Sequence, residues 1–161
     1  MSNIVQNTTL VYKNFSGAPT KYNREGGRPT FAIVLDPQQA DKFREKGFNI
    51  KPFRPQDEEE LYSLEIKVNW NSRFPPNINV IELVQGQVKG KPKPKNRITS
   101  GVLDTFQIKK ADVLFNGHEY DPVDHPGKCT AYLSTAYIHV ELNELDAIYS
   151  EMFMDYDHNE A

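Results

Sequence analysis

Five cations on alternate residues form the most distinctive chemical pattern in the sequence. They lie in the stretch 86–101, which contains Gly and Pro and lacks apolar periodicity, so we predict a loop there. In an extended segment, alternate side chains project together about 6–7 Å apart, similar to the repeat of nucleotides in a strand. A phosphate-binding ribbon and a merely solvated loop both remain open. The five cations are Lys89, Lys91, Lys93, Lys95 and Arg97.

Two further segments combine cations with aromatic residues. Proteins that bind single strands use cationic grooves with aromatic faces on which bases stack, each base contributing roughly 1–3 kcal/mol. Core positions are favoured for Phe15 and Trp70, whereas Tyr22 lies among polar neighbours where no core strand is evident. The residues of these segments that we predict to bind nucleic acid are Lys21, Tyr22, Arg24 and Arg28, and then Trp70 and Arg73.

The net charge of −3 hides a strong segregation of charge along the chain. Residues 1–55 carry +5 and residues 67–110 carry +7, whereas residues 56–66 carry −5 and residues 111–161 carry −10. A basic body with an acidic end is typical of a protein that has a polyanion site and a second, acidic segment with its own role. Such segregation also occurs in proteins without a polyanion ligand. The charge distribution therefore supports nucleic-acid binding together with the basic-aromatic segments, and does not establish it alone.

The acidic end combines seven carboxylates, without Lys or Arg, with large apolar side chains over residues 141–161. One interpretation is a flexible tail over 151–161 that recruits partner proteins and competes with DNA for the basic groove. The other is a short helix over about 144–152 that docks on the domain. We assign residues 1–150 to a nucleic-acid-binding domain. The predicted partner-binding residues of the tail are Phe153, Asp155, Tyr156 and Asp157.

No constellation of residues for catalysis or metal binding is evident. Cys129 is the single thiol, and with His118 and His125 it makes only a weak metal-ligand pattern, because zinc sites favour closely paired ligands. The glycines before Lys91 have the wrong spacing for a phosphate loop, and Pro92 follows the lysine. We therefore predict no enzymatic activity, no cofactor and no metal.

Membrane and secretory classes are not favoured. No run approaches the roughly 20 apolar residues of a membrane span, and the first residues lack the charged start and apolar stretch of a signal peptide. A single cysteine rules out an internal disulfide framework and suits a reducing compartment. We expect a cytoplasmic protein.

Apolar periodicity predicts the elements that position these side chains. Alternation is clearest over 61–70, where every second residue from Tyr62 is apolar. A helix is predicted over 37–46, because Asp36 suits its N-terminal cap and Gly47 its end. This pattern predicts a mainly β protein with a little α: an OB-like barrel of five to seven strands with one inserted helix. The other strands are predicted over 9–15, 31–35, 78–84, 108–115 and 129–142.

Several segments, taken in order, resemble a family of short bacteriophage proteins. They are Lys13–Gly17, Lys21–Arg28, Phe31–Asp36, Gly47–Pro52, Pro75-Pro76, Ile108–Val113 and Thr130–Leu145. Over about residues 10–150 the chain is similar to the small single-stranded-DNA-binding proteins of tailed bacteriophages. The stretch 86–101 departs from the family pattern, in which this connection is shorter and less rich in lysine.

The resemblance implies an OB-like fold, no enzymatic activity and a role in coating single strands during phage DNA replication or recombination. Binding through basic loops and aromatic stacking implies little sequence specificity. Replication or recombination proteins are the partners expected for the tail, and a homodimer stays open. The alternative is a phage protein-interaction module that inhibits or recruits a host protein through its acidic surfaces, because clustered carboxylates can mimic DNA.

Overall fold

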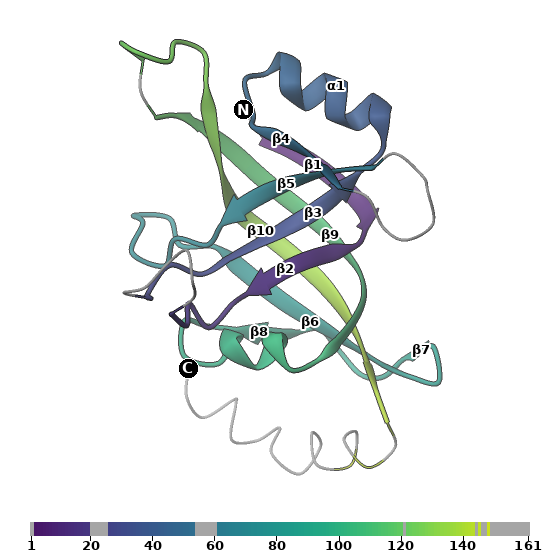
Figure 1. Cartoon of the computed structure of the whole chain (residues 1–161). Coiled ribbons are helices and arrows are strands. Elements are labelled where there is room, and N and C mark those ends of the chain that lie inside the picture. Colours follow the sequence, from purple (N-terminus) through teal and green to yellow (C-terminus); the bar gives the residue numbers. More distant parts are fainter. Residues whose placement is uncertain are drawn as a thin grey trace.

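Ten strands form one hydrogen-bonded sheet in the computed structural model, which describes residues 2–19, 26–53, 61–120, 122–143, 145 and 148 (Figure 1). The described helices are α1 (Pro37–Glu45) and the 3-10 helix η1 (Ser100–Asp104), and neither could span a bilayer. The strands are β1 (Ser2–Thr8), β2 (Leu10–Asn14), β3 (Thr30–Leu35), β4 (Ile50–Phe53), β5 (Leu61–Lys67), β6 (Asn77–Val84), β7 (Gln87–Val88), β8 (Lys93–Lys95), β9 (Gln107–Glu119) and β10 (Cys129–Leu142).

The two strands at the ends of the main strand order, β1 and β2, are consecutive in the sequence. The order is β1-β9-β10-β5-β3-β2, and only Thr9 separates β1 from β2. The Val34 amide donates to the Thr9 carbonyl at 3.0 Å, beside the pairing of β2 with β3. Strands β5 and β10 run parallel, whereas the other neighbours on this path are antiparallel. The sheet therefore curls round until its ends meet on one stretch of chain, as in a partly open OB-type barrel.

The interior of the barrel follows from the alternation of apolar residues. Phe31, Ile33 and Leu35 of β3 are buried to 1% exposure or less, and strands β5, β9 and β10 contribute buried residues in the same way. Phe15 is also buried, and its ring stacks on that of Phe31 with 5.1 Å between centroids. The core position favoured for Phe15 is confirmed, as is the mainly β fold with one inserted α-helix. The predicted number of five to seven strands was too low, because the sheet has ten strands once short ones such as β4, β7 and β8 are included.

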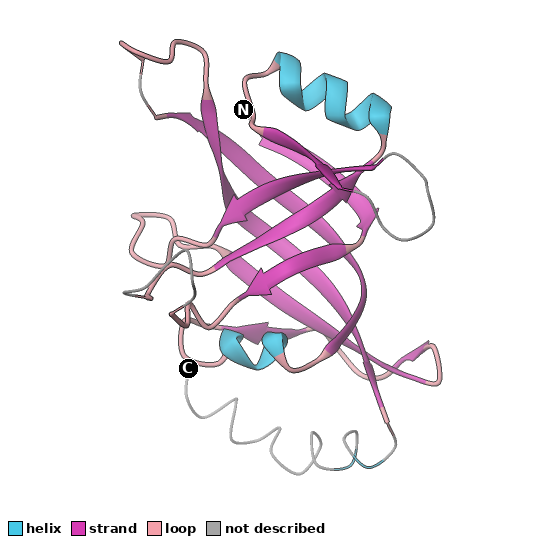
Figure 2. Cartoon of the chain, viewed as in Figure 1, coloured by secondary structure: helices cyan, strands magenta, loops and turns pink. Residues whose placement is uncertain are grey.

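Helix α1 lies at one end of the barrel and η1 towards the other (Figure 2). The Asp36 carboxylate accepts a hydrogen bond from the Gln39 amide at 2.7 Å, and the Gln39 side chain accepts one from the Asp36 amide at 3.2 Å. This capping box begins the helix at the predicted position. Phe43 of α1 is buried, with its ring centroid 5.3 Å from that of Phe115 in β9, so the helix is anchored in the core.

Gly47 ends α1 where the chain passes close to the connection between β9 and β10. Its φ of +97° is in the left-handed region, and a Cβ atom built there would lie 1.7 Å from the Gly127 carbonyl oxygen. The Cys129 amide donates to the Gly47 carbonyl at 2.9 Å. Only glycine satisfies both the dihedral angle and the close approach.

The predicted strand over 9–15 corresponds to β2, whereas the strand before it was not predicted: β1 pairs with β9 from Ser2 onward and buries Val5. Residues 86–101 are not irregular throughout as predicted, because the short strands β7 and β8 pair with β6, and Pro94 is accommodated in β8 on that outer side of β6. The predicted helix over 144–152 and the acidic tail fall almost entirely outside the described residues.

Candidate nucleic-acid interface

The strand register aligns four polar or amphipathic side chains across the outer wall of the barrel. Thr30 of β3 pairs with Lys67 of β5, and Lys67 pairs with Tyr132 of β10. Tyr132 in turn pairs with Asn116 of β9. The residue adjacent to each of them in sequence points into the core, so these four side chains point outward. We call Thr30, Lys67, Tyr132 and Asn116 the transverse row.

A groove of about 600 Å³ lies at the β9–β10 end of the transverse row, between the segment 69–74 and the two strands. Its aromatic faces include Phe74, which is 80% exposed, and Tyr120, which is 57% exposed. The ring of His118 packs edge-on against that of Tyr132, with 5.5 Å between centroids. We call this the stacking groove. Its lining residues are Asn69, Ser72, Phe74, Asn116, His118, Glu119, Tyr120, Thr130, Tyr132, Leu133 and Ser134.

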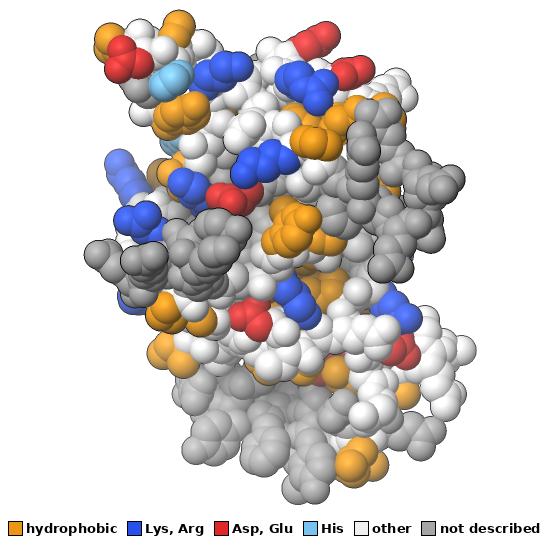
Figure 3. Space-filling model, viewed as in Figure 1, with side chains coloured by type: hydrophobic (Ala, Val, Ile, Leu, Met, Phe, Trp, Pro, Cys, Tyr) orange, Lys and Arg blue, Asp and Glu red, His pale blue; other side chains and the backbone are white. Residues whose placement is uncertain are grey.

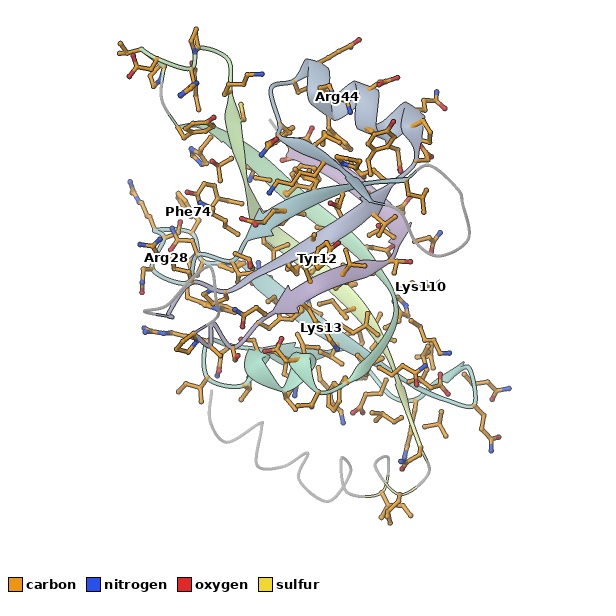
Figure 4. The ribbon with its side chains drawn as sticks, viewed as in Figure 1. Tyr12, Lys13, Arg28, Arg44, Phe74 and Lys110 are labelled. Atoms are coloured by element: carbon orange, nitrogen blue, oxygen red, sulfur yellow. The ribbon has the colours of Figure 1, made fainter. Side chains whose placement is uncertain are left out.

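Cations lie close to the groove and to the face that carries the transverse row. The exposed Arg73 guanidinium is 5.6 Å from the centre of the Phe74 ring. Arg28, also exposed, precedes β3, and Figure 4 draws it at the same edge of the view as Phe74. Figure 3 shows Lys and Arg side chains gathered towards the left and centre of this face. The wall thus combines positive charge with open aromatic rings.

Trp70 has a different environment from its neighbours Arg73 and Phe74. It is half-buried and packs against the core, and its indole Nε1 is buried without a hydrogen-bond partner. It does not line the stacking groove. The core position favoured from the sequence is therefore the better description of Trp70, and Phe74 is the aromatic side chain of this segment that a ligand can reach.

The five cations of the run 89–97 do not share one environment. Lys93 Nζ lies 2.6 Å from Glu82 Oε1, and the two side chains are only 18% and 8% exposed. Lys95 and Lys89 are half-buried, whereas Lys91 and Arg97 are exposed. The pairing of Lys93 with Val80 and of Lys95 with Ile78 explains this division, because Val80 and Ile78 point into the core. Lys91 and Arg97 are the cations of this run most open to an anion.

Three of the residues predicted to bind nucleic acid, Lys21, Tyr22 and Arg24, lie outside the described residues. The predicted partner-binding residues Phe153, Asp155, Tyr156 and Asp157 lie outside them too. These assignments therefore stay predictions, and so does the division of the chain at residue 150.

The sheet brings together Lys67, Asn116 and Tyr132, none of which was predicted to bind from the sequence. The outward positions of Lys67 and Tyr132 could have been found, because each stands between apolar residues of a predicted strand, whereas Asn116 lies just beyond the predicted strand over 108–115. Tyr12 of β2, 70% exposed, was likewise not singled out, and Figure 4 shows it on the front of the barrel wall.

Two other chemical features of the described chain do not suit an anionic ligand or a metal. A second hollow, of about 550 Å³, is lined by Glu141 and by no Lys or Arg. Groups of three or more His, Cys, Asp or Glu side chains able to hold a metal are absent from the described residues. His125 instead packs against Tyr120, with 5.9 Å between ring centroids.

The family model described as "Putative phage ssDNA-binding domain" matches residues 2–159. The chain belongs to this family of phage single-stranded-DNA-binding domains. The resemblance stated from the sequence is thereby confirmed. Among curated proteins no relative matches.

Two solved structures of the single-stranded DNA-binding protein from bacteriophage Enc34 are similar to this phage single-stranded-DNA-binding domain. A C-terminal truncation has 8% sequence identity and a TM-score of 0.48, over 86% of this chain and 85% of that one. The Enc34 protein in complex with ssDNA has 11% identity and a TM-score of 0.44, over 85% of each chain.

Proposed function

We propose that this protein coats single-stranded DNA during phage replication or recombination, with the strand lying along the transverse row and its bases entering the stacking groove. The observation that carries the proposal is the continuity of the two features, since Tyr132 and Asn116 belong to both. A strand on this path meets the Lys67 ammonium group in the row and the Arg73 guanidinium beside the groove. Binding needs no catalytic group, and the protein acts without enzymatic chemistry.

The geometry favours a single strand over a duplex for a chemical reason. Stacking on Phe74 or Tyr132 requires a base whose face is not covered by its neighbours, which is the case only in an unstacked strand. Cations near the groove contribute a term that does not depend on base identity, through phosphate contacts and counterion release. The same cations make binding sensitive to salt.

Lys91 and Arg97, the exposed cations of the run 89–97, are assigned to the same DNA strand on chemical grounds, and so are Lys21, Tyr22, Arg24 and Arg28. The acidic end is proposed to hold replication or recombination proteins through Phe153, Asp155, Tyr156 and Asp157. The working location of such a protein is the cytoplasm of the host cell.

The first test is a fluorescence or electrophoretic titration with a dT oligonucleotide, a duplex of equal length and an RNA control. We expect single-strand DNA binding that weakens with salt. If about five phosphates are engaged, log K against log salt has a slope of about −3 to −4. Equal affinity for duplex, or no binding at low salt, would contradict the proposal.

The second test replaces Phe74 with alanine. Loss of one stacking face should weaken single-strand binding by roughly 1–3 kcal/mol. The melting temperature should hold, because a ring that is 80% exposed contributes little packing. Tyr137→Ala is the matched control, since Tyr137 is a 43% exposed aromatic residue of β10 outside the groove. The affinity of this variant for single-stranded DNA should equal that of the unmodified protein. Equal losses in both variants would remove the groove from the binding site.

A further inference from the structure

The stacking groove contains an amide whose hydrogen-bonding groups are not used within the described chain. Asn116 is half-buried in the groove wall, next to the Tyr132 ring, and its side chain takes part in no hydrogen bond with another side chain or with the backbone. Two other asparagines near these strands differ in this respect. The Asn3 side-chain amide donates to the Phe115 carbonyl, and the Asn69 side-chain oxygen accepts from the Asn71 backbone amide. Asn116 is thus open to a ligand in the groove.

An unpaired base offers what this amide lacks. The Asn side chain presents one acceptor and two donors, and it can be turned about its last torsion so that either group leads. The Watson–Crick edge of each of the four DNA bases carries a donor beside an acceptor, so a single amide can form two hydrogen bonds with any of them. Proteins that recognise single-stranded RNA commonly stack a base on an aromatic ring and form hydrogen bonds with its Watson–Crick edge.

We propose that the stacking groove holds one base on its aromatic faces with the Watson–Crick edge against the Asn116 amide. The inference rests on the proposed function. It assigns to Asn116 a hydrogen-bonding contact that only an unpaired base can make. In a duplex this edge is already occupied by the partner strand, so a paired base cannot make the contact. Because the amide accepts every base, the groove selects single strands without selecting sequence.

Replacing Asn116 with aspartate tests this contact, because a carboxylate has nearly the same shape as the amide. The carboxylate presents two acceptor oxygens and no donor. Guanine is the base whose Watson–Crick edge presents two adjacent donors, N1–H and the 2-amino group. The groove of the unmodified protein should bind all bases with similar affinity, whereas the groove of Asn116→Asp should prefer guanine. A bidentate contact of this kind corresponds to about tenfold in affinity, at the lower end of such contacts.

The experiment uses the full chain and a short dT oligonucleotide with one central base varied among dT, dA, dC, dG and deoxyinosine. The unmodified protein should bind all five within about twofold, since the amide meets one donor and one acceptor on each. Asn116→Asp should bind the dG strand about tenfold more tightly than the other four. Inosine lacks the 2-amino group, so it separates the bidentate contact from a general effect of purines. Asn79→Asp on β6 adds the same charge outside the groove and should leave the order unchanged.

The outcomes distinguish this inference from the proposed function. If Asn116→Asp weakens all five strands alike, or if it favours dG and inosine equally, the base-edge contact is refuted while single-strand binding stands. If the unmodified protein binds none of the strands at low salt, the proposed function itself fails. A Phe74→Ala variant of Asn116→Asp should keep the dG preference at lower overall affinity, because stacking and edge contacts act on different parts of the base.

Discussion

Replacing Lys93 with serine should destabilise the fold, although the residue stands in a run of lysines that looks solvated in the sequence. Its ammonium nitrogen lies 2.6 Å from the Glu82 carboxylate, and the two side chains are 18% and 8% exposed. Removing one partner of a fully buried ion pair costs about 3–5 kcal/mol. Because Lys93 keeps some contact with solvent, we expect a smaller loss, about 2–3 kcal/mol, in the range of charged hydrogen bonds.

That loss is large enough to measure by thermal unfolding. For a chain of this length, 1 kcal/mol corresponds to about 2–4 °C, so the melting temperature should fall by about 4–12 °C. Lys91→Ser is the matched control, because Lys91 belongs to the same run and is exposed, and its melting temperature should stay within about 1–2 °C, as for most surface substitutions. Lys93→Arg should recover most of the stability. Equal melting temperatures for Lys93→Ser and Lys91→Ser would refute the assignment of Lys93 to a structural ion pair.

Two further predictions concern stability. The pKa of His139 is lowered from 6.5, first by burial and then by the charge of Lys110. The unfolded chain therefore binds the proton more readily than the folded one, and the free energy of unfolding should fall as the pH drops below about 6.5. Urea unfolding between pH 5 and 7 measures this dependence on pH, and His139→Gln should remove the part that His139 contributes. Gly47→Ala should unfold at much lower urea concentration than Gly127→Ala, since a Cβ at Gly47 meets the Gly127 oxygen at 1.7 Å whereas nothing lies within 4 Å at Gly127. Equal midpoints for the two glycine variants would show that the close approach does not constrain the fold.

The core and the helix could be predicted from local patterns. Phe31, Ile33 and Leu35 alternate with residues that point the other way, and this period of two identifies a strand without knowledge of its partners. The helix α1 was equally predictable, because Asp36 and Gly47 carry the chemistry of its two ends. These signals are contained in a few consecutive residues.

The strand β8 and the role of Lys93 could not be predicted in the same way. Nothing in the segment Lys93-Pro94-Lys95 favours a strand, and it becomes one because β6 offers an unpaired edge. The environment of Lys93 depends on Glu82, which the sequence analysis did not connect with it. Pairing between distant segments decided both, and a pattern of charges along the chain carries no information about that pairing.

The stacking groove shows the same limit. Tyr132 stands at an outward position of the predicted strand over 129–142, so its exposure followed from alternation, whereas Asn116 lies one residue beyond the predicted strand over 108–115. Their alignment with Lys67 followed from the register of three strands, which alternation does not determine. Arg73 was predicted because it follows an aromatic residue, Trp70, closely in sequence, but the aromatic ring that lies beside it at the groove is that of Phe74.

The stretch of chain formed by β1 and β2, which closes the barrel, also limits the order in which the protein can fold. Strand β1 pairs with β9, and contacts such as the hydrogen bond from Asn3 to the Phe115 carbonyl join residues 112 positions apart. During synthesis β1 leaves the ribosome long before its partner exists, so the barrel cannot close until most of the chain has been made. Pairing over such a separation carries a high loop-closure cost and slows folding. Until β9 arrives, the edge of β1 and the apolar side chain of Val5 stay open to other chains, which makes the nascent protein most prone to aggregate before it is complete.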